Sequence, residues 1–170
     1  MDSAAAGDLR LAVVDADDAA ALARVWHRAN ARRVGAAEDT VPPPDAISRL
    51  GERLRAPGTV VVAGTLLGEM ITTGFGSPLL GPDDQLLAGS AHVSLLSVDP
   101  RWWGRGYGRA TLDFLVSALS MAGYEMAQLH VLENNNRARA LYERAGWRLV
   151  RVGDSHPDGP QAVYERNLRS

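Results

Sequence analysis

Three glycines at alternate positions form the most informative turn in the sequence. The segment 104–108 reads Gly-Arg-Gly-Tyr-Gly; it follows an apolar run that ends at Val98 and leads into an apolar stripe with helical spacing. Glycine lets the backbone turn with positive φ and lets a ligand approach closely. Unpaired N–H groups at a helix start would point at one spot, where the helix dipole also favours negative charge. The segment therefore predicts a cradle for a pyrophosphate, with Arg105 and Arg109 as nearby cationic donors.

Two widespread phosphate-binding patterns do not fit this turn. The P-loop needs a Gly-Lys-Ser/Thr run, and the chain has no lysine, since all 18 of its basic residues are arginine. The dinucleotide fingerprint needs G-x-G-x-x-G, and from Gly104 or Gly106 the third glycine falls out of register. A tight glycine connector without a ligand stays as the structural alternative. The missing lysine also excludes a Schiff-base mechanism.

A second segment, 131–147, lies one strand and one helix further along the chain. It reads as a strand end, an asparagine-rich cap, a helix and a glycine stop at Gly146. Asn135 is a residue type that N-caps favour. Tyr142 shares an apolar stripe with Ala138, so packing in the core would also explain this tyrosine.

Together the two segments resemble the GNAT superfamily of N-acetyltransferases. The signature of that superfamily is Gln/Arg-x-x-Gly-x-Gly/Ala, commonly preceded by Val-x-Pro, and then Asn-x-x-Ala-x-x-x-Tyr-x-x-x-Gly-Phe. The residues at the matching positions are Val98, Pro100, Trp103, Gly106, Gly108, Asn135, Ala138, Tyr142, Gly146 and Trp147. The sequence departs from the pattern where Trp103 replaces Gln/Arg and where Trp147 replaces Phe. The specific part of the resemblance covers about residues 91–150.

The resemblance implies acetyl-CoA as the co-substrate. Its pyrophosphate would lie on the amides of residues 105–109. Its pantetheine arm would run between two strands that splay apart, near Leu96 and Val98 on one side and near 128–132 on the other. The residues predicted to bind it are Leu96, Ser97, Val98, Trp103, Gly104, Arg105, Gly106, Tyr107, Gly108, Arg109, Asn135, Ala138 and Tyr142. No metal is expected, because the histidines show no paired spacing and the chain has no cysteine.

Transfer of an acyl group from a thioester to an amine needs a deprotonated amine, a polarised carbonyl and a proton for the leaving thiolate. The resemblance implies Tyr142 as the general acid and the backbone N–H of Leu96 or Val98 as the oxyanion donor. His92 stands where related enzymes carry a glutamate or histidine base, although it would also fit as a satisfied strand residue. Glu69 and Ser94 are secondary candidates for the base.

The acceptor is expected to be the primary amine of a small molecule or of a peptide N-terminus, attacked directly in a ternary complex. A catalytically silent acyl-CoA-binding regulatory module is the alternative. The acceptor cleft would be bordered by the first two helices, by the connector 37–45 and by the loop 153–160. Residues at this border are Trp26, His27, Arg32 and Arg33, although an arginine pair such as Arg32-Arg33 is more often part of a solvated helix face. The acidic residues there, which mildly suit a cationic amine, are Glu38, Asp39, Asp154 and Asp158.

Composition limits the remaining possibilities. The 170 residues are 46% hydrophobic and 22% charged, which fits one globular domain over 1–170. A net charge of −2 gives no basic footprint for nucleic acid, including a charged tRNA. No apolar run approaches about 18 residues, and the first residues lack the features of a signal peptide. We therefore expect a cytoplasmic protein with no membrane or nucleic-acid partner, for which a homodimer is an open option.

Apolar patterns predict the elements that must position these residues. Their order is β-α-α-β-β-β-α-β-α-β-β, a mixed α/β (α+β) domain on one sheet, and the resemblance implies six to seven mostly antiparallel strands and about four helices. The predicted strands are 8–14, 59–63, 69–75, 91–98, 128–132, 147–152 and 161–166. Asp45 is predicted to cap the second helix, and 77–89 is predicted to be a Pro/Gly/Asp loop.

Overall fold

A seven-stranded sheet forms the centre of the molecule in the computed structural model, which describes residues 8–38 and 41–169. The strands are β1 (Arg10–Val14), β2 (Val60–Leu66), β3 (Glu69–Leu80), β4 (Leu86–Val98), β5 (Met126–Leu132), β6 (Arg148–Asp154) and β7 (Gln161–Asn167). Their order in the sheet is β1-β2-β3-β4-β5-β7-β6. All neighbours are antiparallel except β4 and β5, which run parallel.

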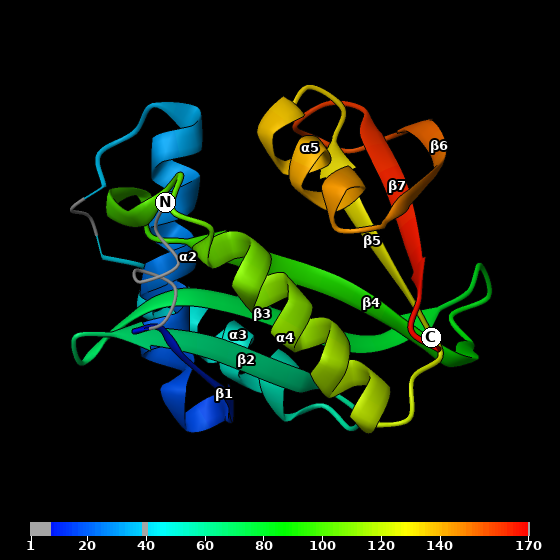
Figure 1. Cartoon of the computed structure of the whole chain (residues 1–170), viewed down its shortest axis with the longest axis horizontal. Helices are drawn as coiled ribbons and strands as arrows, with labels where there is room; N and C mark the ends of the chain where they lie inside the picture. Colours follow the sequence, from blue (N-terminus) through cyan, green and yellow to red (C-terminus); the bar gives the residue numbers. More distant parts are fainter. Residues whose placement is uncertain (1–7, 39–40, 170) are drawn as a thin grey trace.

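Helices cover both faces of this sheet (Figure 1). They are α2 (Ala19–Val34), α3 (Pro44–Arg55), α4 (Tyr107–Met121) and α5 (Asn136–Arg144), with two short 3₁₀ turns, η1 (Ala16–Asp18) and η2 (Pro100–Trp102). One apolar core joins α2 and α3 to β2 and β3. A second core lies around α4 and extends to β5, β7 and the end of α5. The observed order of strands and helices confirms the predicted order, and the mixed α+β class is confirmed with it.

Two local predictions are wrong. The segment 77–89 is mostly strand, because β3 continues to Leu80 and β4 begins at Leu86, and only a tight turn closed by the Gly81 N–H and the Gln85 carbonyl separates them. Pro78 is tolerated there because the pairing of β2 with β3 ends at Gly76, so its missing N–H breaks no ladder bond on that side. Asp45 does not cap α3.

The start of α3 is set by prolines instead. Pro43 is the N-cap residue and Pro44 is the first residue of the helix, a position where the fixed φ of proline suits the helix and its missing N–H costs no bond. Asp45 lies in the first turn and accepts a hydrogen bond from Arg49 at 2.8 Å, one turn further along the helix.

Strands β4 and β5 are paired over only a short stretch. The pairs run from Ser90 with Met126 to Val93 with Leu129. Beyond Val93, β4 remains paired with β3 up to Val98, while β5 diverges from it, as Figure 1 shows. The predicted splay is therefore present, and the side of β4 that faces β5 has no strand partner over its last residues.

Candidate active site

The glycine turn lies between the end of β4 and the start of α4. Gly104 and Gly106 have φ of 77° and 85°, in the left-handed region, and Gly106 is the N-cap of α4. A Cβ built on either glycine would meet no atom within 4 Å, so this backbone borders open space. A Cβ on Gly108 would lie 3.4 Å from Cγ2 of Val98. The first N–H groups of a helix have no partner within it, so the amides and the helix dipole at this turn are available to an anion.

Two tryptophans fix the turn and orient two arginines beside it. Trp103 donates from Nε1 to the carbonyl of Val98 at 2.7 Å and carries the guanidinium of Arg137 at 4.8 Å from its ring centre. Arg105 lies over the ring of Trp102 at 4.9 Å. Trp103 thus acts as a structural anchor in a position where the superfamily pattern has Gln or Arg.

The sequence predicts Arg109 as a cationic donor beside the turn, but its side chain is bonded to other protein groups. Its guanidinium is held by the carboxylate of Asp113 at 3.0 Å and donates to the carbonyl of Arg144 at 3.2 Å. The side chain therefore ties α4 to the end of α5. Only the backbone amide of Arg109 keeps the predicted geometry, since it belongs to the first turn of α4.

A buried carboxylate lies next to the turn and binds two arginines. Asp99 is 1% exposed and accepts hydrogen bonds from Arg101 at 2.8 Å and from Arg28 at 3.1 Å. Burial by itself would raise the pKa of Asp99, but the hydrogen bonds from the two arginines outweigh burial and lower this pKa. Glu69 belongs to the same ion cluster, 2.6 Å from Arg101.

The second predicted segment forms the start of α5 as expected. The side chain of Asn135 accepts a hydrogen bond from the Ala138 N–H at 3.2 Å, so it is a helix cap. Tyr142 is buried, with its ring 6.1 Å from the rings of both Trp147 and Tyr164. Burial raises the pKa of Tyr142 to about 12, so the phenol stays protonated at neutral pH.

Two imidazoles meet where β4 and β5 part. The rings of His92 and His130 have centroids 5.4 Å apart in an edge-on arrangement. Nδ1 of His92 and Oγ of Ser94 are buried and have no hydrogen-bond partner among the described residues. Residues two apart on a strand share a face, so these two unpartnered atoms lie on one face of β4. Buried polar atoms are normally hydrogen-bonded, by ordered water where no protein group is near, so both atoms still need a partner.

Burial is the main cause that lowers the pKa of His92, and the charges of His130 and Arg53 lower it further. Burial also lowers the pKa of His130, which Asp154 partly offsets while Arg151 and His156 add to the decrease. Both imidazoles are therefore neutral at pH 7, the state in which an imidazole accepts a proton.

Comparison with known proteins decides the family. Residues 44–147 match the model of the acetyltransferase (GNAT) family. The chain belongs to this family. A mycothiol acetyltransferase from Propionibacterium freudenreichii is 31% identical over 125 residues, which are 74% of this chain and 39% of that protein. A [ribosomal protein bS18]-alanine N-acetyltransferase from Haemophilus ducreyi is 30% identical over 78 residues, 44% of this chain and 54% of that protein.

A solved structure shows the same GNAT fold over nearly the whole chain. It is an acetyltransferase from Salmonella typhimurium with its cofactor acetyl-CoA, with a TM-score of 0.75 at 17% identity, covering 96% of this chain and 95% of the other. The chain spans less than half the length of the mycothiol acetyltransferases that it matches, 22% of one from Beutenbergia cavernae and 39% of the one from Propionibacterium freudenreichii.

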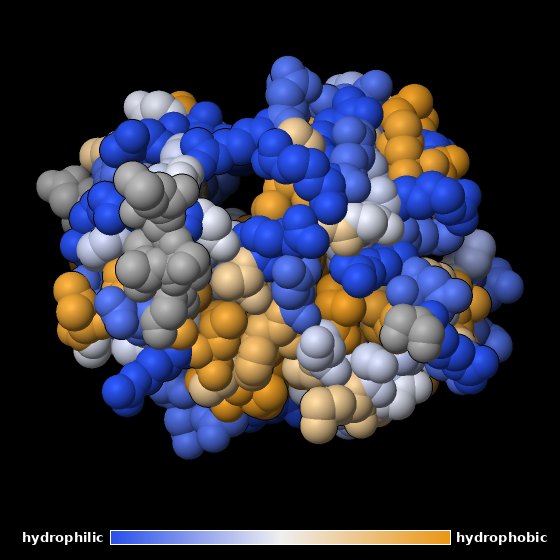
Figure 2. Space-filling view, in the orientation of Figure 1, coloured by the Kyte–Doolittle hydropathy of each residue, from blue (hydrophilic) through white to orange (hydrophobic). Residues whose placement is uncertain are grey.

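Not all of the predicted residues lie near the splay of β4 and β5. Figure 2 shows a hollow on the face of the molecule between the start of α4 and α5, bordered mainly by hydrophilic residues. Glu69 is five positions along β3 from Gly74, which lies opposite residues 95–96, or about 16 Å at the rise of a strand. Its ion pair with Arg101 and this distance both disfavour Glu69 as the base.

Sequence reasoning did not assign several groups of this GNAT domain. No motif of the sequence assigns a role to His130, and only the pairing of β4 with β5 places its ring beside His92. The hydroxyl of Tyr164 donates to Glu143 at 2.7 Å and accepts from Arg139 at 3.0 Å, and no local pattern marks this network. In the described part of the chain, no three His, Asp or Glu side chains are grouped to hold a metal ion.

Two of the four acidic residues predicted to attract a cationic acceptor are paired with arginine. Glu38 is paired with Arg32, and Asp154 is paired with Arg151 at 3.0 Å. Asp39 lies outside the described residues. Within residues 8–38 and 41–169, no helix is long and apolar enough to cross a membrane.

Proposed function

We propose that this protein transfers the acetyl group of acetyl-CoA to the primary amine of a small molecule or of a peptide N-terminus. The observation that carries the proposal is the conjunction of the open glycine turn at the start of α4 with the splay of β4 and β5. Family membership supports it, as does the acetyl-CoA named with the Salmonella structure. The alanine N-acetyltransferase among the relatives supports an amine acceptor.

The residues present fit acetyl-CoA. The pyrophosphate would accept hydrogen bonds from the amides of 105–109, where a side chain on Gly106 would fill the open space that the ligand needs. Arg105 and Arg137, held on their tryptophan rings, would supply charge at the rim. The pantetheine arm would then continue into the splay, where the unpaired side of β4 offers backbone hydrogen bonds.

The proposed reaction is direct attack of the amine on the thioester. The nitrogen forms the new C–N bond as the C–S bond breaks, and the proton lost by the amine goes to neutral His92, directly or through a water between His92 and Ser94. The backbone N–H of Leu96 or Val98 stabilises the developing charge on the carbonyl oxygen. The departing thiolate takes up one proton, so that protons balance.

Tyr142 is proposed to interact with the departing thiolate, as a hydrogen-bond donor and not as an acid that transfers its proton fully. Full transfer from a phenol of pKa about 12 to a thiolate of pKa about 8.5 is uphill by roughly 5 kcal/mol. We therefore expect Tyr142 to donate a hydrogen bond to the sulfur, with the proton following from solvent.

The charge around His92 bears on the acceptor. Arg53 acts on His92 and lies over the ring of Phe75 at 5.1 Å, whereas the acidic residues Glu38 and Asp154 are each paired with an arginine. Local charge therefore does not hold a protonated polyamine, and we expect an acceptor whose amine is accompanied by a carbonyl or carboxylate, as at a peptide N-terminus or in an amino-sugar conjugate.

A thiol-release assay tests the proposal. The protein and acetyl-CoA are incubated with matched acceptors, comprising N-terminal peptides, amino acids, amino sugars and polyamines. We expect release with at least one acceptor of the first three groups. If acetyl-CoA binds in calorimetry and no acceptor releases thiol, the silent binding module is the better description.

A further inference from the structure

Strand β4 contains a bulge at the edge of the splay. Thr73 pairs with Ser97 and Phe75 pairs with Ser94, so two residues of β4, Leu95 and Leu96, lie opposite Gly74 alone. The φ of Leu95 is +52°, a left-handed conformation that costs a residue with a side chain roughly 1–2 kcal/mol. Such strain persists only where the surroundings hold it in place.

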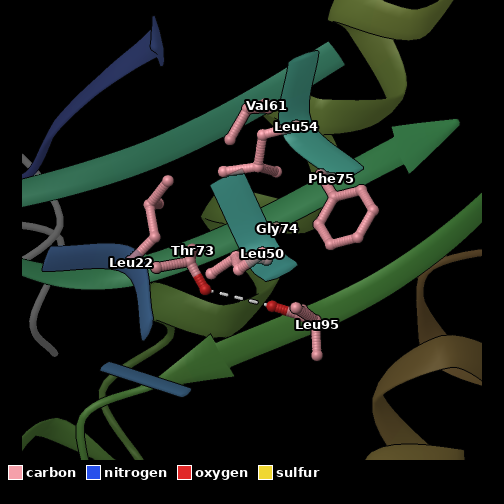
Figure 3. Close-up of a pocket in the computed structure, with 8 residues that line it drawn as sticks. All are labelled: Leu22, Leu50, Leu54, Val61, Thr73, Gly74, Phe75 and Leu95. Carbon is pink, nitrogen blue, oxygen red and sulfur yellow. Dashed lines mark hydrogen bonds between the residues drawn. The ribbon is translucent and has the colours of Figure 1, made fainter. Parts of the chain in front are cut away.

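One buried hydroxyl holds this bulge. Thr73 is 3% exposed and donates from Oγ1 to the carbonyl of Leu95 at 3.0 Å, as Figure 3 shows. Between these groups and the helices lies a cavity of about 10 Å³, no larger than one water. The residues that line it are Leu22, Leu50, Leu54, Val61, Thr73, Gly74, Phe75 and Leu95. Thr73 contributes the only polar side chain of that lining.

A peptide unit is planar and trans, so its C=O and the following N–H point in opposite directions. Fixing the Leu95 carbonyl on Thr73, toward α2 and α3, therefore fixes the Leu96 N–H in the opposite sense. Leu96 lies in the core on the α4 side of the sheet, and a Cβ on Gly74 would approach its Cδ1 to 3.3 Å. The hydroxyl thus determines where a backbone donor on the unpaired stretch of β4 points.

We propose that Thr73 is a positioning residue for acetyl transfer, whose hydroxyl aims the Leu96 N–H at the thioester carbonyl. This inference rests on the proposed function. Thr73 touches neither substrate; it acts through the Leu95–Leu96 peptide. Loss of the hydroxyl frees that peptide to rotate, and the oxyanion loses a donor that was in place before reaction.

The neighbouring threonine supplies a matched control. Thr72 is fully buried, and its Oγ1 accepts a hydrogen bond from Thr111 of α4 at 2.8 Å, on the other side of the sheet from Thr73. Thr72→Val and Thr73→Val each remove one buried hydroxyl without changing side-chain shape. The two variants should lose similar thermal stability, and only the second should disturb the bulge.

The first test is kinetic, with acetyl-CoA and any acceptor that releases thiol. Thr73→Val should lower kcat by about 10²-fold, the usual effect of one oxyanion donor, while KM for acetyl-CoA changes by less than about threefold, because the pyrophosphate amides are untouched. Thr73→Ser should restore most of kcat. If Thr73→Val fails to fold, Thr73→Ala takes its place with the same expectation. Wild-type kcat in Thr73→Val, or an equal loss in Thr72→Val, overturns the proposal.

The second test needs no acceptor. Calorimetry compares acetyl-CoA with the thioether S-ethyl-CoA, which has the same shape but no carbonyl oxygen. The wild-type protein should bind acetyl-CoA about fivefold more tightly, the effect of one hydrogen bond, and Thr73→Val should lose this preference. An unchanged preference overturns only the role of Thr73. If the wild-type protein binds neither compound, the proposed function fails and the role of Thr73 fails with it.

Discussion

The imidazoles of His92 and His130 meet at the point where β4 and β5 stop pairing. His92 was predictable as a candidate because it lies on the strand that leads to the glycine turn. Its partner could not be predicted, because 38 residues of sequence separate His130 from it and only the parallel pairing of the two strands brings the rings together. Burial lowers the pKa of both imidazoles, and the nearby His130 lowers that of His92 further.

Replacing His130 should change the pH dependence of His92. Because burial, His130 and Arg53 all lower the pKa of His92 from 6.5, the acidic limb of kcat/KM should lie below that pH in the wild-type protein. His130→Gln removes one of the neighbouring charges, so the limb should move to higher pH, and His92→Gln should abolish it. NMR titration of the imidazoles checks the same shift in the protein without acceptor.

His156→Gln is the control for this comparison, because it removes a histidine that acts on His130 but is not among the causes acting on His92. An unchanged titration of His92 in His130→Gln would show that the two rings are not coupled.

Tyr142→Phe separates the chemical role of the hydroxyl from the packing of the ring. The ring contacts with Trp147 and Tyr164 are kept, so the melting temperature should change little. Loss of the hydrogen bond to the leaving sulfur should lower kcat by about 10²-fold, with acetyl-CoA affinity nearly unchanged. Single-turnover kinetics with a good acceptor measures the chemical step. Turnover at the wild-type rate would assign Tyr142 to the core alone, and unfolding of the variant would do the same.

At the scale of elements, the sequence predicted those helix ends that depend on the residue types next to them. Glycine and asparagine at fixed offsets placed both ends of α5 and the start of α4, because caps and left-handed turns depend on residue type. The extension of β3 and β4 across 77–89 was missed, since Pro78 and the glycines argue against strand in isolation. Pairing with the other strand overrode that preference. The bulge at Leu95 has no sequence signature at all, because its register depends on two strands.

The glycine turn gives the sharpest test at this scale. Gly106→Asp should weaken acetyl-CoA binding by at least about 100-fold, because it places a side chain and a negative charge in the space that the pyrophosphate needs. Gly123→Asp is the control, since Gly123 also has positive φ (+99°) and open space, at the opposite end of α4. Both variants should lose about 1 kcal/mol of stability through backbone strain.

Calorimetry with acetyl-CoA and thermal melting provide the two measurements for these glycine variants. Equal affinities of the two folded variants for acetyl-CoA would show that the glycine turn does not bind the pyrophosphate.

At the scale of the whole molecule, ion pairs and hydrogen bonds of arginine side chains help to set the relative positions of the elements. Arg28 of α2 and Arg101 of η2 both bond the buried carboxylate at the end of β4, and Arg109 of α4 bonds the end of α5. The partners are 71 residues apart for Arg28 and Asp99, and 35 for Arg109 and Arg144. Because all 18 Lys and Arg positions of the chain are arginine, many equivalent donors are present. The sequence alone therefore could not show which arginine would bond which acceptor.

Asp99→Asn tests whether this cluster holds the site together. The side chain of Asp99 is 2% exposed, whereas those of Arg28 and Arg101 are 32% and 52% exposed, so solvent lessens the cost of the lost pair and we expect about 2 kcal/mol of destabilisation at pH 7. Asp113→Asn, which breaks an exposed pair on α4, should cost less than about 0.5 kcal/mol.

Because the pKa of Asp99 is lowered in the folded protein, its contribution to stability should be constant above its unfolded pKa of about 4. That contribution should be lost as the pH falls through the lower folded value. Urea denaturation of both variants from pH 7 to pH 3 measures this, and a difference that disappears already above pH 5 would contradict it.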